Sequence, residues 1–140
     1  MNLQLLQPAV RAYLMEHIHD NAASFLLKSH SFQDITSQEL TQQLIGLQKA
    51  RLKFPLFFEN DQIIFPPKVN LEQTSSWTTA MYKASLFNGE NMVDLTGGFG
   101  IDISAFAQVF KNSTHIELDP KLQELAMQSF KAQGLSLIHI

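Results

Sequence analysis

Three glycines lie within four positions of the chain, at Gly97, Gly98 and Gly100. Glycine has no Cβ atom, so the backbone can approach a bound ligand closely at these positions. An apolar segment that ends in Asp94 precedes them, and a helix expected to begin near Ile101 would direct its free amide groups to the same point. The pattern predicts a ligand-binding turn between a strand and a helix.

Two kinds of phosphate-binding loop are also rich in glycine, but the spacing fits neither of them. A dinucleotide-binding loop has the pattern G-x-G-x-x-G and would require glycine at position 103, where Ile103 stands. A P-loop requires a lysine followed by serine or threonine, and no such pair follows Gly100. The remaining pattern, D-L-x-x-G-x-G from Asp94 to Gly100, suits a ligand without phosphate.

A carboxylate follows at the expected tip of the next strand. Glu117 lies 17 residues after Gly100, close to the interval of about 20 residues at which an acidic side chain reaches a ribose diol across a βαβ unit. Asp119 and Pro120 then have the types expected for the N-cap and first residue of the following helix. Together these features predict a nucleoside site. A purely structural glycine turn and a solvated Glu117 are the alternatives.

With these residues in place, the segment 93–119 resembles motifs I and II of class I S-adenosylmethionine-dependent methyltransferases. The runs 72–76, 79–80, 82–84 and 94–100 are similar to a group found in Bacteroidetes, in which a small N-terminal domain precedes the methyltransferase domain and a THUMP-like C-terminal domain. The similarity covers most of residues 1–134. It implies S-adenosyl-L-methionine as the cofactor and, through the THUMP-like domain, RNA as a partner held by segments outside this chain.

The resemblance also implies a role in cofactor binding for eight residues: Asp94, Thr96, Gly97, Gly98, Phe99, Gly100, Glu117 and Leu118. The glycines would lie along the methionine part of the cofactor. Asp94 would hold its amino group, Glu117 its ribose hydroxyls, and Leu118 would pack against the adenine. Many members of the larger class have glycine where Thr96 stands, so a contact of its hydroxyl with the cofactor is the less specific expectation.

The expected fold class is α/β, with a small, mainly helical N-terminal module over residues 1–67. The first βαβα part of a Rossmann-like methyltransferase domain would follow over residues 68–134, and Pro66 and Pro67 mark the boundary. A capping box at 36–39 predicts the start of a helix that ends near Phe54. The other expected elements are a short hairpin or an extended arm over 56–65, helices over 71–88, 101–110 and 121–131, and strands over 92–95 and 114–117.

Several polar and aromatic residues have structural explanations. Asp102 is expected to be the N-cap of its helix, with a ligand contact as the alternative. Lys83 is expected to be solvated, and the alternative is a position near an anionic substrate. The run 73–76 is expected to cap the helix that contains Trp77, with the mouth of the pocket as the alternative. Four phenylalanines are expected to form the core that joins the two modules: Phe54, Phe57, Phe58 and Phe65. Three cations are expected to complement the dipole at the end of their helix: Lys49, Arg51 and Lys53.

The composition narrows the class of protein further. The chain has 140 residues, a net charge of −3, a pI near 5.9 and no cysteine, so thiolate metal sites, disulfides and cysteine nucleophiles are excluded. We expect no metal, no membrane span and a cytoplasmic location.

No residue can be assigned as a catalytic base, because two strands and two helices form only the start of a methyltransferase domain. We therefore expect a truncated, inactive fragment. The last residues, 135–140, could form the third strand, but they coincide with the translation of a widely used sequencing adapter and are expected to be an artefactual tail. A non-catalytic helical interaction module with a structural glycine turn is the alternative function.

Overall fold

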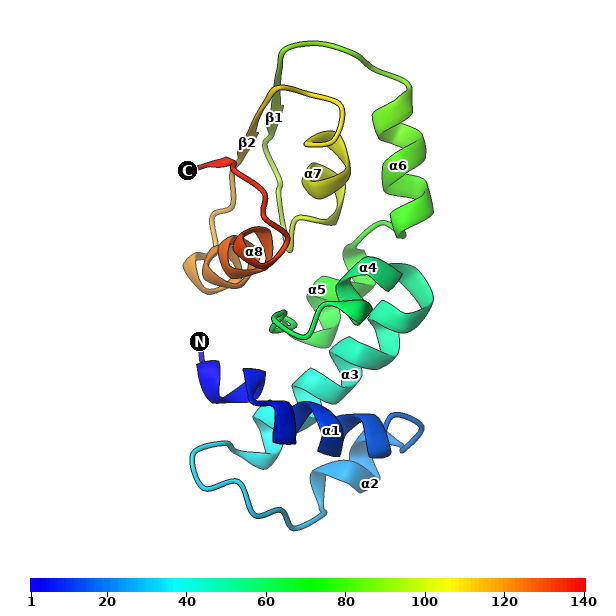
Figure 1. Cartoon of the computed structure of the whole chain (residues 1–140), viewed down its shortest axis with the longest axis vertical. Coiled ribbons are helices and arrows are strands. Elements are labelled where there is room, and N and C mark those ends of the chain that lie inside the picture. The colour runs from blue at the N-terminus through cyan, green and yellow to red at the C-terminus, as the bar shows by residue number, and fades with distance from the viewer.

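A computed structural model describes residues 1–140, with His139 described by its backbone alone. The N-terminal part of the chain is a layer of helices, and a small parallel sheet with its covering helices forms the other end of the molecule (Figure 1). The helices before the sheet are η1 (Leu3–Leu6), α1 (Pro8–Glu16), α2 (Ala22–Leu26), α3 (Ser37–Lys53), α4 (Pro55–Glu59), α5 (Lys68–Gln73) and α6 (Trp77–Ser85).

The longest of these helices, α3, begins and ends as its sequence predicts. The Thr36 hydroxyl accepts a hydrogen bond from the Glu39 backbone N–H, and the Glu39 carboxylate accepts one from the Thr36 backbone N–H. This capping box satisfies two amide groups that the helix itself leaves without a partner. Lys53 and Arg51 lie in the last turn, where positive charge complements the helix dipole, as expected.

Of the two structures expected over residues 56–65, the hairpin is wrong. Residues 55–59 form the short helix α4, because Pro55 at its first position has a fixed φ that suits a helix start and needs no N–H there. Residues 61 and 62 form a turn, and residues 63–65 continue as an arm without a neighbouring strand, which is the alternative to the hairpin. The strand propensity of these residues favoured a hairpin. In the folded protein, the backbone of this segment finds hydrogen-bond partners other than a second strand.

Glutamine side chains replace the missing strand along this extended segment. The buried Gln43 amide of α3 donates to the Ile63 carbonyl over 2.7 Å and accepts from the Phe65 N–H over 3.0 Å. Gln42 donates to the Phe65 carbonyl, and Gln128 accepts from the Ile64 N–H. The backbone of a buried segment must find such partners, and here one side chain supplies both a donor and an acceptor.

The single helix expected over 71–88 is two helices. The segment breaks after Gln73, and Ser76 begins α6 by accepting a hydrogen bond from the Thr79 N–H. The expectation that this run caps the helix of Trp77 is confirmed for Ser76. Residues 74 and 75 form the connection between α5 and α6 instead.

The sheet contains three parallel strands in the order β1-β2-β3. Its elements and their connections are β1 (Asn91–Asp94), α7 (Ile101–Phe106), β2 (Asn112–His115), α8 (Pro120–Ala132) and β3 (Ile138–His139). Both expected strands are present, but each begins and ends slightly earlier than predicted, with Asp94 paired to His115. Leu95 and Glu117 therefore lie beyond the strand ends, in the loops that follow them.

Both α7 and α8 pack against the same face of the sheet. Ile103 of α7 and Phe130 of α8 form a cluster with Met92 of β1. The next residue along β1, Val93, points to the opposite face and is 52% exposed. As expected, Asp119 caps α8 by accepting from the backbone N–H groups of Lys121 and Leu122.

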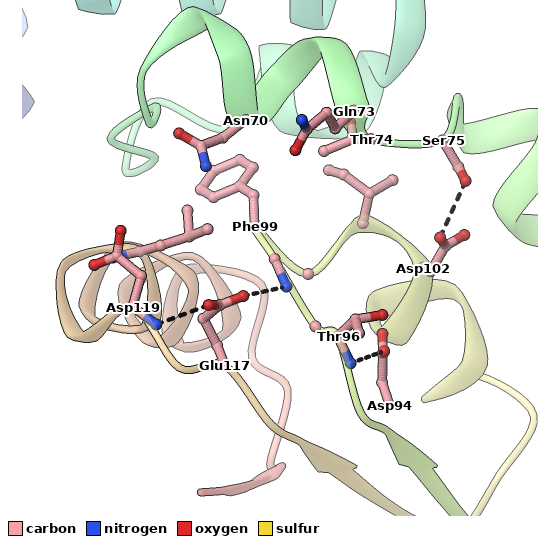
Figure 2. Close-up of a pocket in the computed structure, with 15 residues that line it drawn as sticks. Asn70, Gln73, Thr74, Ser75, Asp94, Thr96, Phe99, Asp102, Glu117 and Asp119 are labelled. Carbon is pink, nitrogen blue, oxygen red and sulfur yellow. Dashed lines mark hydrogen bonds between the residues drawn. The ribbon is translucent and has the colours of Figure 1, made fainter.

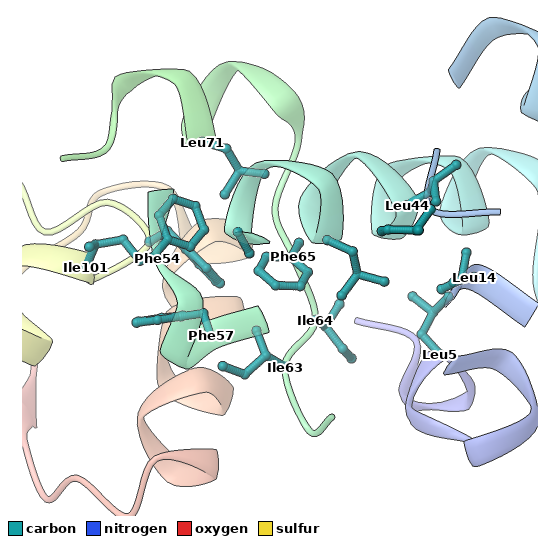
Figure 3. Packing of buried hydrophobic residues seen from close by; sticks show 14 of the residues in the cluster. Leu5, Leu14, Leu44, Phe54, Phe57, Ile63, Ile64, Phe65, Leu71 and Ile101 are labelled. Carbon is teal, nitrogen blue, oxygen red and sulfur yellow. The ribbon is translucent and has the colours of Figure 1, made fainter. Parts of the chain in front are cut away.

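One hydrophobic cluster extends from η1 through the N-terminal helices to α7 and α8 (Figure 3). The expected aromatic core is confirmed: three of the four phenylalanines, Phe54, Phe57 and Phe65, have no exposed surface, and Phe58 packs against them partly buried. The packing is continuous across residue 67, and the division into domains there stays a prediction. Within the part of the chain that the structure describes, no helix is long and apolar enough to cross a membrane.

The glutamine that bridges the extended segment gives a prediction about stability. We expect Gln43→Leu to lower the free energy of unfolding by about 2–4 kcal/mol, because it leaves the Ile63 carbonyl and the Phe65 N–H without that partner inside the protein. Urea unfolding followed by circular dichroism measures the change. The matched control is Gln38→Leu at an exposed position of the same helix, which should change stability by less than about 0.5 kcal/mol. Equal effects of the two substitutions would contradict the assigned role.

Candidate functional site

The glycine turn joins β1 to α7 with two residues in the left-handed region of backbone space. Gly98 has φ +53° and Gly100 has φ +87°, where a side chain would be strained. The Gly100 N–H donates to the Gly97 carbonyl over 2.9 Å, and the Gly97 N–H donates to the Ile116 carbonyl over 2.8 Å. The turn is thereby closed on itself and fastened to the loop after β2.

Glu117 lies directly against this turn. One carboxylate oxygen accepts from the Gly98 N–H over 2.9 Å, and the other accepts from the Asp119 N–H over 2.8 Å (Figure 2). The two predicted halves of the site are therefore on the same side of the sheet and in contact. A Glu117 that merely ends its strand in solvent does not describe this geometry.

Asp94 turns back on the loop that follows it. Its Oδ1 accepts from the Thr96 N–H over 3.1 Å, which is the geometry by which aspartate stabilises a turn. The side chain is partly buried and faces the same cavity as Glu117 (Figure 2).

His115 contacts the glycine turn from the end of β2. It was not among the predicted site residues. It is fully buried at the end of β2, with Nε2 3.1 Å from the Gly98 carbonyl oxygen and its ring edge-on to Phe130. A Cβ atom on Gly97 would overlap the imidazole ring. The alternation of buried residues along β2, at Ser113 and His115, was the signal that could have found it.

A second wall of the site comes from the helical part of the chain. Asn70 and Gln73 of α5, with Thr74 and Ser75 of the next connection, lie across the cavity from the glycine turn (Figure 2). For the part of the run 73–76 that does not cap α6, the alternative position at the mouth of the pocket is therefore the one found. From the sequence, a position at the pocket was only the alternative for the run 73–76.

Two expectations about charged residues at this wall are wrong. Asp102 is not the N-cap of α7: Gly100 occupies that position, and Asp102 lies in the first turn. Lys83 is not simply solvated, because its Nζ lies 2.6 Å from Asp102 Oδ1 and 2.8 Å from Ser75 Oγ. The pairing arises where α6 and α7 pack together, a tertiary contact that the sequence does not specify.

These walls enclose a cavity of about 500 Å³. The lining residues are Asn70, Gln73, Thr74, Ser75, Asp94, Thr96, Gly97, Gly98, Phe99, Gly100, Ile101, Asp102, Glu117, Asp119 and Leu122. Four of them are carboxylates and none is lysine or arginine, so the cavity favours a ligand with positive charge and hydroxyl groups over one with phosphates. Among the residues that the structure describes, no group of histidine and carboxylate side chains is arranged to hold a metal ion.

Seven of the eight predicted cofactor residues line this cavity, and Leu118 does not. Its side chain is 93% exposed, because it follows Glu117 in the chain and points away from the cavity. The buried Leu122 of α8 is the apolar side chain that lines the cavity near Glu117. Phe99 is only 1% exposed, and its ring packs against Phe57 and Phe65. That these residues bind a cofactor stays a prediction.

Comparison with known proteins bears on the fold. No family model and no curated protein sequence matches this chain. A crystal structure from Porphyromonas gingivalis W83, provisionally named a methyltransferase, is 22% identical over 99% of this chain with a TM-score of 0.77, and the chain spans 36% of its length. A protein-L-isoaspartate O-methyltransferase is 15% identical, with a TM-score of 0.41, over 99% of this chain and 41% of its own. The chain therefore has the fold of the matching part of the Porphyromonas protein.

Gly98 and Gly100 are expected to differ in how much stability is lost when each is replaced by alanine. Gly98→Ala should cost about 1 kcal/mol of stability, because its φ is positive but the space around it is open. Gly100→Ala should cost about 3 kcal/mol, because a Cβ there also overlaps the Phe130 ring. Urea unfolding compares them with Gly134→Ala, which has φ +70° and no atom near the new Cβ. If Gly100→Ala lowers the free energy of unfolding no more than Gly134→Ala does, the overlap with the Phe130 ring does not restrict the residue at position 100.

Proposed function

We propose that this chain binds S-adenosyl-L-methionine in the cavity and forms the cofactor site of a methyltransferase. The observation that supports the proposal is the contact between the Glu117 carboxylate and the Gly98 N–H, at 2.9 Å. It places an acidic side chain beside a glycine turn that is open to a ligand, at the interval at which a βαβ unit holds a ribose.

The residues present fit the cofactor in three respects. Each oxygen of Glu117 accepts one backbone N–H and has remaining lone pairs for a ribose hydroxyl. Asp94 offers a carboxylate to an ammonium group on the other side of the turn. The excess of carboxylates suits a sulfonium ion, and it opposes the phosphates of a dinucleotide.

When bound, S-adenosylmethionine supplies an activated methyl group on a positively charged sulfur. The residues of this chain orient it: Glu117 fixes the ribose, Asp94 the amino group, and the glycines allow the backbone to approach the part between them. Transfer is an in-line displacement, so such orientation is the main contribution that a cofactor site can make. No residue here is assigned as a base toward the methyl acceptor.

The fold supports the reaction class. The chain shares its fold with part of the Porphyromonas protein, whose provisional name is methyltransferase, and spans 36% of it. The activity of the whole protein therefore belongs to the proposal. A THUMP-like domain and membership of the Bacteroidetes group rest on the resemblance of the motifs.

We also propose that the methyl acceptor is RNA, which only the resemblance supports. Six cations and six carboxylates balance over residues 1–68, whereas residues 69–140 have four lysines and seven carboxylates, so the charge of this chain does not itself attract a polyanion. The test is to incubate a protein containing this sequence with cell extract and methyl-labelled cofactor, and then to separate RNA, DNA and protein. Label confined to protein or DNA would refute an RNA acceptor.

Cofactor binding is tested by isothermal titration calorimetry with S-adenosylhomocysteine, the demethylated product. We expect the full chain to bind it, and Glu117→Ala or Asp94→Ala to weaken binding by about 10- to 100-fold, the cost of losing hydrogen bonds to a charged partner. Glu117→Gln, which retains one acceptor oxygen, should lose less than Glu117→Ala. The control Glu90→Ala removes an exposed carboxylate just before β1 and should bind like the native chain.

Two results would contradict this assignment. If the folded chain takes up no S-adenosylhomocysteine, the glycine turn is structural and a helical interaction module becomes the better description. If ATP binds as tightly as S-adenosylhomocysteine, the acidic cavity does not select against phosphate.

A further inference from the structure

Three polar side chains form a closed ring at the end of the cavity away from Glu117. Ser75 and Asp102 lie on one side of the cavity, and Glu117 and Asp119 lie on the other (Figure 2). The third member of the ring, Lys83, lies on α6. The three residues come from the α5–α6 connection, α6 and α7, so the ring joins the helical wall to the helix that follows the glycine turn.

All three contacts of the ring are short. Lys83 Nζ lies 2.6 Å from Asp102 Oδ1 and donates to Ser75 Oγ over 2.8 Å, and Ser75 Oγ donates to Asp102 Oδ2 over 3.0 Å. Lys83 therefore forms a hydrogen bond with Ser75 and an ion pair with Asp102. In the described part of the chain, no other lysine or arginine forms an ion pair with a carboxylate that lines the cavity.

The connection that bears Ser75 is also fixed from its other side. Lys53, in the last turn of α3, donates to the Thr74 carbonyl over 2.9 Å and to the Leu71 carbonyl over 3.3 Å. The ring is therefore held in place by the helical part of the chain. A ligand group that meets it would meet a preformed surface.

This arrangement has a consequence for a ligand whose nucleoside end lies at Glu117. The rest of such a ligand extends toward Asp94 and Asp102, two carboxylates that would both repel a negative group. Lys83 neutralises one of them, whereas Asp94 has no cation partner among the described residues. Lys83 does not itself line the cavity and acts through Asp102 and Ser75, which do. The two sides of this end thus match an ammonium group at Asp94 and a carboxylate group beside Ser75.

We propose that Lys83 is a positioning residue that makes this end of the cavity specific for a ligand with a free α-carboxylate, through its pairing with Asp102 and Ser75. The inference rests on the proposed function and adds to it the recognition of the amino-acid part of the cofactor. In this role Lys83 selects among sulfonium nucleosides, which a purely structural ion pair would not do.

The test compares two ligands that differ only in that carboxylate, S-adenosylmethionine and its decarboxylated form, by calorimetry on the full chain. We expect Lys83→Met to weaken binding of S-adenosylmethionine about five- to tenfold, the order for one partly exposed charge pair. Binding of the decarboxylated form should not weaken, because it has no carboxylate for the unpaired Asp102 to repel. Asp102→Asn should shift the ratio of the two affinities in the opposite direction.

Two further variants separate this role from a structural one. Lys83→Arg retains the charge and should retain the native ratio, and Lys111→Met removes an exposed lysine between α7 and β2 and should leave both affinities unchanged. If Lys83→Met does not fold, Asp102→Asn and Lys83→Arg still decide the question. Equal loss of both ligands in Lys83→Met, or an unchanged ratio in Asp102→Asn, would overturn the inference. If the native chain binds neither ligand, the proposed function fails first.

Discussion

The cavity depends on one carboxylate that accepts hydrogen bonds from two backbone amide groups. Glu117 joins the Gly98 N–H of the first loop to the Asp119 N–H of the second, and hydrogen bonds to a charged acceptor are the stronger kind. Beneath them, His115 lies within hydrogen-bond distance of the Gly98 carbonyl. Both polar groups at Gly98 are therefore held from the neighbouring strand end, which fixes the turn before any ligand arrives and reduces the cost of ordering it on binding.

Phe99 connects this turn to the rest of the molecule. Its neighbours Gly98 and Gly100 have no side chain to obstruct the cavity, whereas its own ring is buried against Phe57 and Phe65. The loop thus has a ligand face and a core face in adjacent residues. Because its core partners come from the helical part of the chain, that part supplies both the opposite wall of the cavity and the anchor of the turn. The anchor comes from before residue 67, at Phe57 and Phe65, and the opposite wall from residues 70–75, so both sides of the expected boundary contribute to the site.

Features that depend on local chemistry could be predicted from the sequence. The capping box of α3, the Asp119 cap and the glycine turn each follow from a few neighbouring residues, and the contact with Glu117 followed from the interval between two strands. Features that depend on packing could not. In place of the expected hairpin there is a helix and an arm held by Gln43, and Leu118 is exposed on the outer side of its loop, with Leu122 of α8 lining the cavity instead.

The distribution of charge adds a constraint that the glycine pattern alone does not. The net charge of −3 belongs entirely to residues 69–140, with seven carboxylates against four lysines, and four of those carboxylates line the cavity. A loop built to hold phosphate needs exposed amide groups without competing anions, whereas here Glu117 already occupies the Gly98 N–H. The carboxylate that would hold a ribose therefore also blocks the anion site at the turn. Under the proposed function, one side chain would exclude phosphate and hold a cationic nucleoside, and the turn would differ in chemistry from the dinucleotide loops that it resembles in shape.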